Sequence, residues 1–447
     1  LSEATFHLAP EEVRIHTHDV GGGFGTKEFP YPEDIAVMFA ARATGRPVKW
    51  TSTRSEAFLA DHHGRDHDFD AELALDKDGK FLALRIRLIA DMGAYTHQFG
   101  VAIPWFGAAM ATGVYDIPVL DFSLTGVFTN TTPVDAYRGA GRPEACFLLE
   151  RIMETAAREL DVDPAELRRA NFIREFPHQT PVIMAYDAGD FAGNLDQALE
   201  AADYKGFPAR KADAAKRGKL RGIGLGYYIE KCGGGNPETA DIRFTEDDKI
   251  EIYIGNQSNG QGHETAYAQV LGDVLGIDGE RIRIVQGDTD RTPPGLTGGS
   301  RALPVGGVAV LLGGREIVEK GKKVAGRVME AAIEDIEFAD GTFTVAGTDK
   351  TMSLFDVNRA AEGEELARQE PPVDPVEIEI GRFQLRRIDP GEHEHGEGEC
   401  REHQQLQLCD HVRCGVGHIV NVIGQERIER LRPDTDPHAK YRRRAHR

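Results

Sequence analysis

The stretch TPVDAYRGAGRPEAC, Thr132–Cys146, is the most informative part of this sequence. Arg138 stands directly before a Gly-Ala-Gly turn, and Pro143 opens a segment with apolar residues at helical spacing. Two further glycine-rich segments are GGGFGTKE at Gly21–Glu28 and GNQSNGQGHET at Gly255–Thr265. Glycine permits a positive φ and lets a ligand approach main-chain N–H groups. Three such loops in one chain indicate a site for a large polar ligand or an oxyanion.

Length and composition exclude several classes of protein. A chain of 447 residues can form two or more compact units with buried cores. Its formal charge of −20 argues against a general nucleic-acid binder, because phosphate contacts need basic clusters. The sequence has no run of 18 apolar residues, so we expect no membrane span. Sparse cysteines before residue 380 and the lack of a signal-peptide pattern predict a cytoplasmic location.

Apolar periodicity predicts an α+β fold of mixed sheets and helices in at least two units, because strands and helices do not alternate strictly. Helices are predicted at 32–45, 143–160, 164–173, 263–275 and 306–332. Strands are predicted at 13–19, 47–51, 68–75, 80–90, 221–230, 240–244, 249–254 and 281–286, with a hairpin at 337–346. We expect a first cofactor-binding portion at 1–204, a connection at 205–220, a second portion at 221–368 and an anomalous tail at 369–447.

The tail differs in composition from the rest of the chain. From Gly381 onward it contains 13 Lys/Arg, 11 Asp/Glu, 7 of the 16 His and 3 of the 5 Cys, without apolar periodicity. We expect this region to be disordered or to derive from a shifted reading frame. Its His and Cys residues raise the possibility of zinc, but they contain no CxxC pair, so no zinc site is assigned.

Each glycine-rich loop carries side chains suited to polar ligands, and each has a simpler explanation as well. Arg138 offers a charged fork of donors for an oxygen anion, although a salt bridge would also explain it. Gln261 can donate and accept hydrogen bonds, and the N–H groups before the predicted helix at His263 suit an anion. HExxH is absent here, so His263 is not a zinc-ligand candidate. The loop containing Phe24 lacks the GxxxxGK[ST] spacing of a P-loop and is otherwise an ordinary turn.

Together with EACFLLERIMETAARELDVDPAELRRANFI (Glu144–Ile173), HETAYAQVLGDVLGI (His263–Ile277) and RIRIVQGDTDRTPPGLTGGSRA (Arg281–Ala302), these loops mark a family. From about residue 11 to 355 the chain resembles the molybdenum-binding large subunit of the xanthine dehydrogenase and aldehyde oxidase family. Its nearest likeness is to the carbon monoxide dehydrogenase large subunits. The resemblance implies molybdenum with molybdopterin cytosine dinucleotide, and no side chain directly on the metal. The cofactor contacts it implies are Gly22, Gly23, Phe24, Gly25, Arg138, Gln261, Gly262, His263 and Ser300.

The resemblance also implies a reaction, in which aldehydes or N-heterocycles are hydroxylated with oxygen from water. Arg138 would stabilise the substrate or transition state. Electrons would leave through iron–sulfur and FAD-binding subunits, in a dimer of heterotrimers. Family members that oxidise carbon monoxide carry AYRCSFR, whose cysteine holds copper. Gly139 stands at that position and offers no thiolate, so carbon monoxide chemistry is disfavoured.

Two other functions stay open, a non-catalytic cofactor-binding or assembly fragment and a phosphate-binding sugar or nucleotide enzyme. The family's catalytic glutamate stands in a C-terminal GxGE-type loop. Gly396-Glu-Gly-Glu399 has that pattern but comes too early, so the role is not assigned to it. The sequence opens without Met, just before GGGFGTKE, and we expect a fragment of a longer protein with little turnover by itself.

Overall fold

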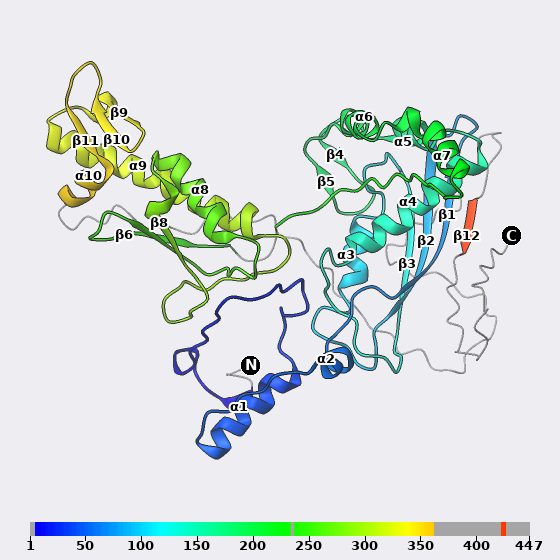
Figure 1. Cartoon of the computed structure of the whole chain (residues 1–447), viewed down its shortest axis with the longest axis horizontal. Helices are drawn as coiled ribbons and strands as arrows, with labels where there is room; N and C mark the ends of the chain where they lie inside the picture. The colour runs from blue at the N-terminus through cyan, green and yellow to red at the C-terminus, as the bar shows by residue number, and fades with distance from the viewer. Residues whose placement is uncertain (1–4, 234–236, 362–421, 426–447) are drawn as a thin grey trace, which may run out of the picture. The chain divides into compact units, whose positions relative to one another are not determined.

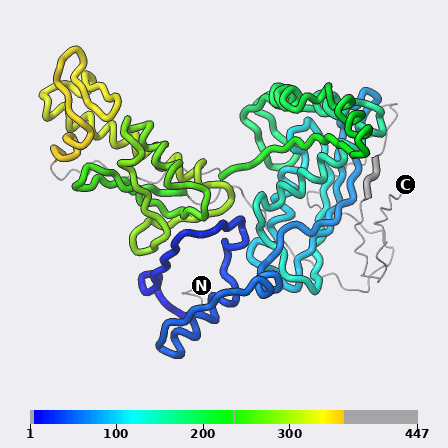
Figure 2. Tube along the Cα trace, viewed as in Figure 1, coloured from blue at the N-terminus to red at the C-terminus, as the bar shows by residue number. Residues whose placement is uncertain are grey.

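The computed structural model describes residues 5–233, 237–361 and 422–425. The chain forms two compact units, the first from Leu1–Thr53 with Lys231–Ile380 and the second from Arg54–Glu230 with Gly381–Arg447. Figure 2 lets the reader follow the chain from the blue N-terminal segment through the second unit and on to the yellow part of the first. Helices combine with mixed and antiparallel sheets, which confirms the α+β class.

The division by contacts differs from the expected division by sequence. The sequence predicts continuous portions at 1–204 and 221–368, whereas the first unit joins residues 1–53 to residues 231–380. Long-range main-chain bonds produce this arrangement, since Thr17 N donates to Gly287 O at 2.7 Å. The expected connection at 205–220 contains a helix, α7 (Phe207–Lys216), and the chain passes between the units at residues 230–231.

The second unit is built on a sheet with strand order β12-β1-β2-β3 (Figure 1). Strands β1 (His67–Leu75) and β2 (Phe81–Asp91) form the predicted antiparallel hairpin, with Leu73 opposite Leu84. Strand β3 (Leu120–Val127) runs parallel to β2, and β12 (Val422–Gln425) runs antiparallel to β1. The remaining elements of this unit are α2 (Arg54–Ala60), α3 (Ile103–Ala109), β4 (His178–Gln179), β5 (Ala185–Tyr186) and α6 (Phe191–Ala201).

Helix α4 (Arg142–Glu159) covers this sheet and carries the core of the second unit. Leu149 and Met153 on its inner face are buried among the side chains of β1 and β2. Helix α5 (Pro164–Asn171) follows, with Asp163 as N-cap accepting from Ala165 N at 2.8 Å. Both helices match the predicted segments to within two residues.

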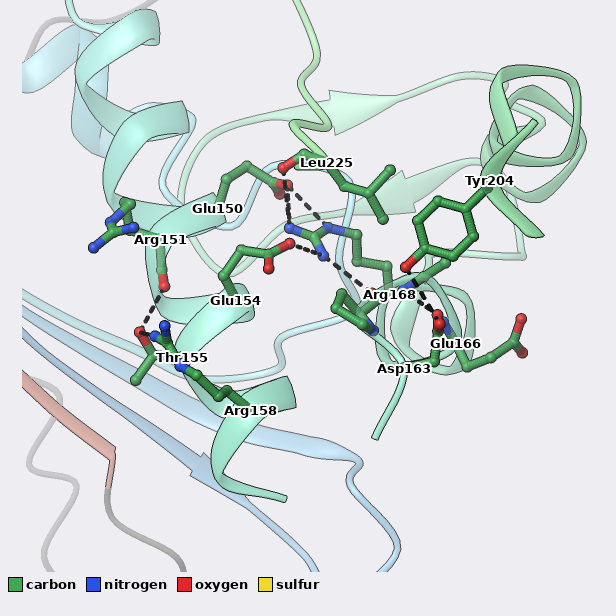
Figure 3. Close-up of polar contacts among 12 residues, drawn as sticks. Glu150, Arg151, Glu154, Thr155, Arg158, Asp163, Glu166, Arg168, Tyr204 and Leu225 are labelled. Atoms are coloured by element: carbon green, nitrogen blue, oxygen red, sulfur yellow. Dashed lines mark hydrogen bonds and ion pairs between the residues drawn. The ribbon is translucent and has the colours of Figure 1, made fainter. Parts of the chain in front are cut away.

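A buried charge cluster joins α4 to α5 (Figure 3). The Arg168 guanidinium, with a side chain that is 0% exposed, donates to Glu150 Oε2 at 2.8 Å and pairs with Glu154 Oε1 at 2.9 Å. It also donates to the Leu225 carbonyl at 3.3 Å. Tyr115 donates its hydroxyl to Glu150 at 2.6 Å, and burial raises the pKa of Tyr115 well above its usual value. Arg168 therefore holds two helices and the 221–230 segment together.

The first unit contains the sheet β6-β7-β8, formed by Ala240–Phe244, Ile250–Ile254 and Ile282–Val285. Helices α8 (His263–Leu275) and α9 (Val308–Met329) pack on it through a buried apolar core that includes Ile252 and Leu271. Beyond them lie the antiparallel strands β9 (Ile336–Ala339), β10 (Thr342–Val345) and β11 (Thr351–Ser353), then α10 (Leu354–Ala360). Helix α1 (Pro32–Thr44) belongs to the same unit.

Three predicted strands are wrong. Residues 47–51 form no strand, and residues 13–19 contribute only an isolated bridge between His16 and Asp288. Residues 221–230 alternate apolar and polar side chains as predicted, but Leu225 and Tyr227 pack on the α4 core and pair with no strand. Their main-chain carbonyls contact side chains, Leu225 O with Arg168 and Tyr227 O with Cys146, so the alternation does not correspond to a sheet.

Apart from β12, the tail at 369–447 lies outside the described residues. The same is true of the His and Cys residues considered for zinc and of Gly396-Glu-Gly-Glu399. Among the residues that the structure does describe, no helix is long and apolar enough to cross a membrane.

Candidate cofactor site

Two of the three glycine-rich loops come together in the first unit. Gly22 N donates to Asn259 O at 2.9 Å, which joins the loop at 21–28 to the loop at 255–262. A Cβ atom at Gly23 would lie 3.0 Å from the Asn259 side chain, so glycine permits this approach. Gly22 and Gly25 both adopt φ values near +95°, in the region that favours glycine.

A pocket of about 450 Å³ opens beside these loops. Its walls come from residues 17–20, from the 257–264 loop and from the end of strand β8. Arg283 and Arg291 line it together with Gly260 and Gly262 at the start of α8. The first N–H groups of a helix have no partner within the helix and attract anions. The pocket therefore combines two cations, two carboxylates (Asp19 and Glu264), helix-start amides and polar side chains, and the arginines and amides among them suit a phosphate-bearing ligand.

Gln286, at the carboxyl end of β8, connects three parts of this pocket. Its side-chain oxygen accepts from Ser258 N at 2.8 Å and lies 3.2 Å from His263 Nδ1, while its amide donates to Glu264. Because the oxygen can only accept, His263 carries its proton on Nδ1. Burial lowers the pKa of His263, which keeps the ring neutral, and its Nε2 is buried without a hydrogen-bond partner among the described residues.

The order of the strands in the sequence carries a signal for Gln286. Strands β7 and β8 are parallel, so their carboxyl ends meet at one edge of the sheet. The 255–262 loop follows β7, and Gln286 follows β8 directly.

A buried polar network supports the loops from below. Arg301 Nη1 lies 3.0 Å from Glu238 Oε2, and Glu238 Oε1 accepts from Asn256 N at 3.1 Å. The Tyr267 hydroxyl lies 2.7 Å from Asn256 Oδ1 and 2.8 Å from the Ala302 carbonyl. Burial raises the pKa of Glu238, although the Arg301 charge opposes this shift. The network ties the 255–262 loop to the Gly-Gly-Ser-Arg loop that precedes helix α9.

The sequence-predicted residues of this unit lie around the same loops. Phe24 is 52% exposed, with φ +54°. Gln261 folds onto its own loop, where its Oε1 accepts from Asn259 N at 2.5 Å, and it does not line the pocket. Ser300 is exposed, and its carbonyl accepts from Gly233 N at 3.2 Å. A Cβ at Gly298 would lie 2.2 Å from the Glu28 carboxylate, so the Ser300 loop borders the 21–28 loop.

Arg138 lies in the second unit, so the structure does not bring it together with Phe24, Gln261 and Ser300 in one compact unit. Its side chain is exposed on the turn that leads into α4. Gly141 adopts φ +91°, and a Cβ there would lie 2.5 Å from Gly107 N, so the turn packs closely on α3. Glu144 Oε2 accepts from Gly141 N at 2.9 Å, which ties the first turn of α4 back to the residue before the helix.

The segment His62-His-Gly-Arg-Asp66 contacts this turn and is not among the site residues that the sequence predicts. His62 Nε2 lies 3.0 Å from the Ala136 carbonyl, and Arg65 donates to the carbonyls of Tyr137 and Arg138. No sequence pattern in the chain pairs these two segments, which are about 70 residues apart. In the described parts of both units, no group of three or more His, Cys, Asp or Glu side chains is arranged to hold a metal ion.

Comparisons with known proteins identify the family to which the chain belongs. Models of the molybdopterin cofactor-binding domain match residues 1–172 and residues 197–377. The chain is 38% identical over 396 residues to the carbon monoxide dehydrogenase large chain of Hydrogenophaga pseudoflava, covering 83% of this chain and 49% of that protein. The chain belongs to the xanthine dehydrogenase family, as a molybdenum-binding large subunit.

Two further relatives of this large subunit have other substrates in their names. This chain is 33% identical over 362 residues to the 6-hydroxypseudooxynicotine dehydrogenase complex subunit gamma of Paenarthrobacter nicotinovorans, and the match covers 79% of this chain and 46% of that protein. The crystal structure of quinoline 2-oxidoreductase from Pseudomonas putida 86 superposes with a TM-score of 0.74 at 33% identity, covering 79% and 47% of the two chains. The chain spans about half the length of the curated relatives it matches.

The first unit contains loops from both of the regions that the family models match. The loop at 21–28 lies in the match at 1–172, and the loops at 255–262 and 298–301 lie in the match at 197–377. Arg138 belongs to the first match as well, but to the other compact unit. Each compact unit therefore carries at least one loop that the sequence predicted to bind the cofactor.

Proposed function

We propose that this chain is the molybdenum-binding portion of an oxidoreductase that hydroxylates aldehydes or N-heterocycles, with oxygen drawn from water. The observation that carries the proposal is the pairing of the 21–28 and 255–262 loops beside a pocket lined by Arg283 and Arg291. The names of the nicotine-derivative and quinoline relatives support the substrate class.

The residues of the first unit fit a dinucleotide form of the cofactor, and we propose molybdopterin cytosine dinucleotide. Its diphosphate needs cations and N–H donors, which Arg283, Arg291 and the start of α8 provide. Gly262 has no atom within 4 Å of an added Cβ position, so the loop leaves open space where a ligand can approach the main chain. The proposed contacts of this unit are Gly22, Gly23, Phe24, Gly25, Gln261, Gly262, His263 and Ser300.

The protein's own part in the reaction is to position and to stabilise charge. When bound, the cofactor supplies the redox chemistry and the activation of water. The Arg138 guanidinium would stabilise negative charge that develops on the substrate. Gln286 holds Ser258 and His263 in place, and the neutral His263 ring adds no charge beside the loop. Phe24, half exposed on its loop, offers an apolar face to a planar group.

Gly139 argues against copper-dependent oxidation of carbon monoxide, despite the names of some relatives. The residue has φ +95°, and a Cβ there would lie 2.5 Å from Pro143 Cγ. A cysteine at 139 would therefore be strained and would clash with the first turn of α4. The neighbouring Cys146 lies within that helix, where burial raises the pKa of its thiol, so it does not replace the missing thiolate.

The proposal extends to the assembly. Because relatives are named as one chain or subunit of larger complexes, we propose partner subunits that carry iron–sulfur clusters and FAD, in a dimer of heterotrimers. A cytoplasmic location is part of the same proposal, supported by the free thiols of Cys146 and Cys232.

The test is to purify the full-length subunit with its natural partners and to measure molybdenum and released cytidine monophosphate per chain. Dye reduction is then followed with an aldehyde, with quinoline or nicotine, and with carbon monoxide. We expect one molybdenum and one nucleotide per subunit, and turnover with an aldehyde or N-heterocycle but not with carbon monoxide. Molybdenum without turnover would favour the binding or assembly function, and nucleotide without molybdenum would favour a sugar or nucleotide enzyme.

A further inference from the structure

Arg65 reaches the turn that carries Arg138 and binds its main chain at two consecutive carbonyls. Nη1 donates to Tyr137 O at 3.0 Å, and Nη2 donates to Arg138 O at 2.7 Å. The guanidinium also lies 5.2 Å from the centroid of the Tyr137 ring. A planar fork with two parallel donors can fix the orientation of two successive peptide groups, which a lysine ammonium cannot do.

The same guanidinium reaches the other end of the turn through Glu144. Arg65 Nη1 lies 3.5 Å from Glu144 Oε1, and Glu144 Oε2 accepts from Gly141 N at 2.9 Å. The Glu144 side chain is 4% exposed and the Arg65 side chain 34% exposed, so water screens this pair only in part. One side chain therefore contacts the carbonyls that enter the turn and the carboxylate that caps its exit.

The backbone around Arg65 is shaped for this contact. A Cβ at Gly64 would lie 2.4 Å from Tyr137 Cβ, so glycine allows the two segments to touch. Arg65 and Asp66 adopt φ values of +76° and +65°, a left-handed pair of non-glycine residues. Such a conformation costs energy and persists where the surrounding contacts over-determine it.

The residues just before the turn are also fixed. The Asp135 carboxylate is fully buried and accepts from Ala136 N at 2.6 Å, and it lies 2.6 Å from His97 Nδ1. His62 Nε2 lies 3.0 Å from Ala136 O. The main chain up to Ala136 is thus held by other side chains, and Arg65 donates to the carbonyls of the two residues that follow.

We propose that Arg65 is a positioning residue, which acts through the main chain of Tyr137 and Arg138 to aim the Arg138 guanidinium at the substrate. This inference rests on the proposed function, because Arg138 acts on substrate only if the subunit is a hydroxylase. Arg65 itself touches neither substrate nor cofactor in this assignment.

The first test measures the turn itself by hydrogen exchange in the full-length complex. Arg65→Ala should speed amide exchange in the peptide that contains residues 134–147, and added guanidinium ion should slow it again, since the Arg65 side chain is 34% exposed and the site is accessible. Arg65→Lys keeps the charge without the fork and should exchange at nearly the rate of Arg65→Ala. The control is Arg85→Ala on strand β2, whose exposed pairs with Glu72 and Asp121 lie elsewhere on the sheet, and it should leave this peptide unchanged.

The second test is a double-mutant cycle on substrate turnover. Misplacing a reacting or stabilising group can cost on the order of 100-fold in rate, so Arg65→Ala should lower kcat/KM by about 10- to 100-fold with molybdenum content unchanged. In an Arg138→Ala background the same Arg65→Ala change should have little further effect, because the group it positions is gone. Additive losses, or exchange that is unchanged in Arg65→Ala, would overturn the proposal.

These outcomes are distinct from a failure of the proposed function. If the wild-type complex contains no molybdenum and turns over no aldehyde or N-heterocycle, the proposed function fails whatever the exchange data show. If the wild-type complex is active and both Arg65 variants match it in exchange and in kcat/KM, only the positioning role fails.

Discussion

The two compact units hold their predicted cofactor loops by different means. In the first unit the loops meet through main-chain bonds such as Gly22 to Asn259, the amide of Gln286 and a close approach at Gly23, and the buried Arg301–Glu238 pair supports them. In the second unit the turn at 137–141 is held by charged side chains, Arg65 and Glu144. Added volume at the glycine contacts tests the first arrangement, and removal of one charge from a pair tests the second.

The largest expected effect comes from the buried charge of the second unit. Arg168→Met leaves Glu150 and Glu154 without their cation, and breaking a buried pair costs about 3–5 kcal/mol. Hydrogen exchange in α4 and α5 should rise strongly, while exchange in α8 and α9 of the first unit stays the same. The matched control is Arg169→Ala next to it, whose exposed partners Glu166 and Asp196 should make the change worth about 0–1 kcal/mol. Equal effects of the two variants would contradict a special role for buried charge.

A smaller effect is expected from added volume in the first unit. A Cβ at Gly255 would lie 2.5 Å from Gly295 N and 2.6 Å from Pro293 O, which are main-chain atoms that must move together. Gly255→Ala should cost about 1–3 kcal/mol in the free energy of unfolding of this unit, measured by denaturant titration with exchange as the local probe. Gly21→Ala, on the neighbouring loop with nothing within 4 Å of its added Cβ, should be nearly neutral. A costly Gly21→Ala would show that chain stiffness, not volume, decides.

Acid should weaken both units in the same direction, although less than these substitutions. Burial lowers the pKa of His62 in the second unit and of His263 in the first. The unfolded chain, with histidine near its ordinary pKa of about 6.5, therefore binds protons at a higher pH than the folded chain. Stability should be full above that pH and should fall as pH decreases through it. Thermal unfolding at pH 7.5 and 5.5 measures this loss of stability, and His62→Asn and His263→Asn should each make it smaller. If both variants lose as much stability as the wild type between these two pH values, these histidines are not the cause.

The smallest effect is expected at Arg14, whose ion pairs with Asp288 and Asp290 anchor the N-terminal segment of the first unit. Arg14 Nη2 pairs with the Asp288 carboxylate at 2.6 Å, and this pair lowers the pKa of Asp288 to about 2. Arg14→Gln should loosen residues 13–19 in hydrogen exchange and leave global unfolding unchanged. High salt should produce part of the same local loosening in the wild type, because the Arg14 side chain is 54% exposed and its charge is screened. Insensitivity of this segment to both changes would show that the main-chain bond from Thr17 N to Gly287 O suffices.

Local patterns in the sequence predicted most of the regular structure. The hairpin at β1 and β2, the helices α4, α5 and α8 and the strands β6 to β8 appear within two residues of their predicted ends. These elements carry their own signals, such as Asp163 and Pro164 at the start of α5. The wrong strands had the right alternation but no strand partner: residues 221–230 pack against helices, and residues 13–19 form a single bridge.

The sequence by itself determined the family, the α+β class and the glycine-rich loops, because those depend on short runs of neighbouring residues. Only the tertiary structure decided that the loops at 21–28 and 255–262 share one compact unit and that Arg138 belongs to another. It also decided that Gln286 binds the 255–262 loop and that Arg65 binds the turn of Arg138. The physical reason is separation along the chain. A contact between residues 65 and 138, or 22 and 259, leaves no periodic trace in the sequence, since it depends on how distant segments pack and not on local conformational preference.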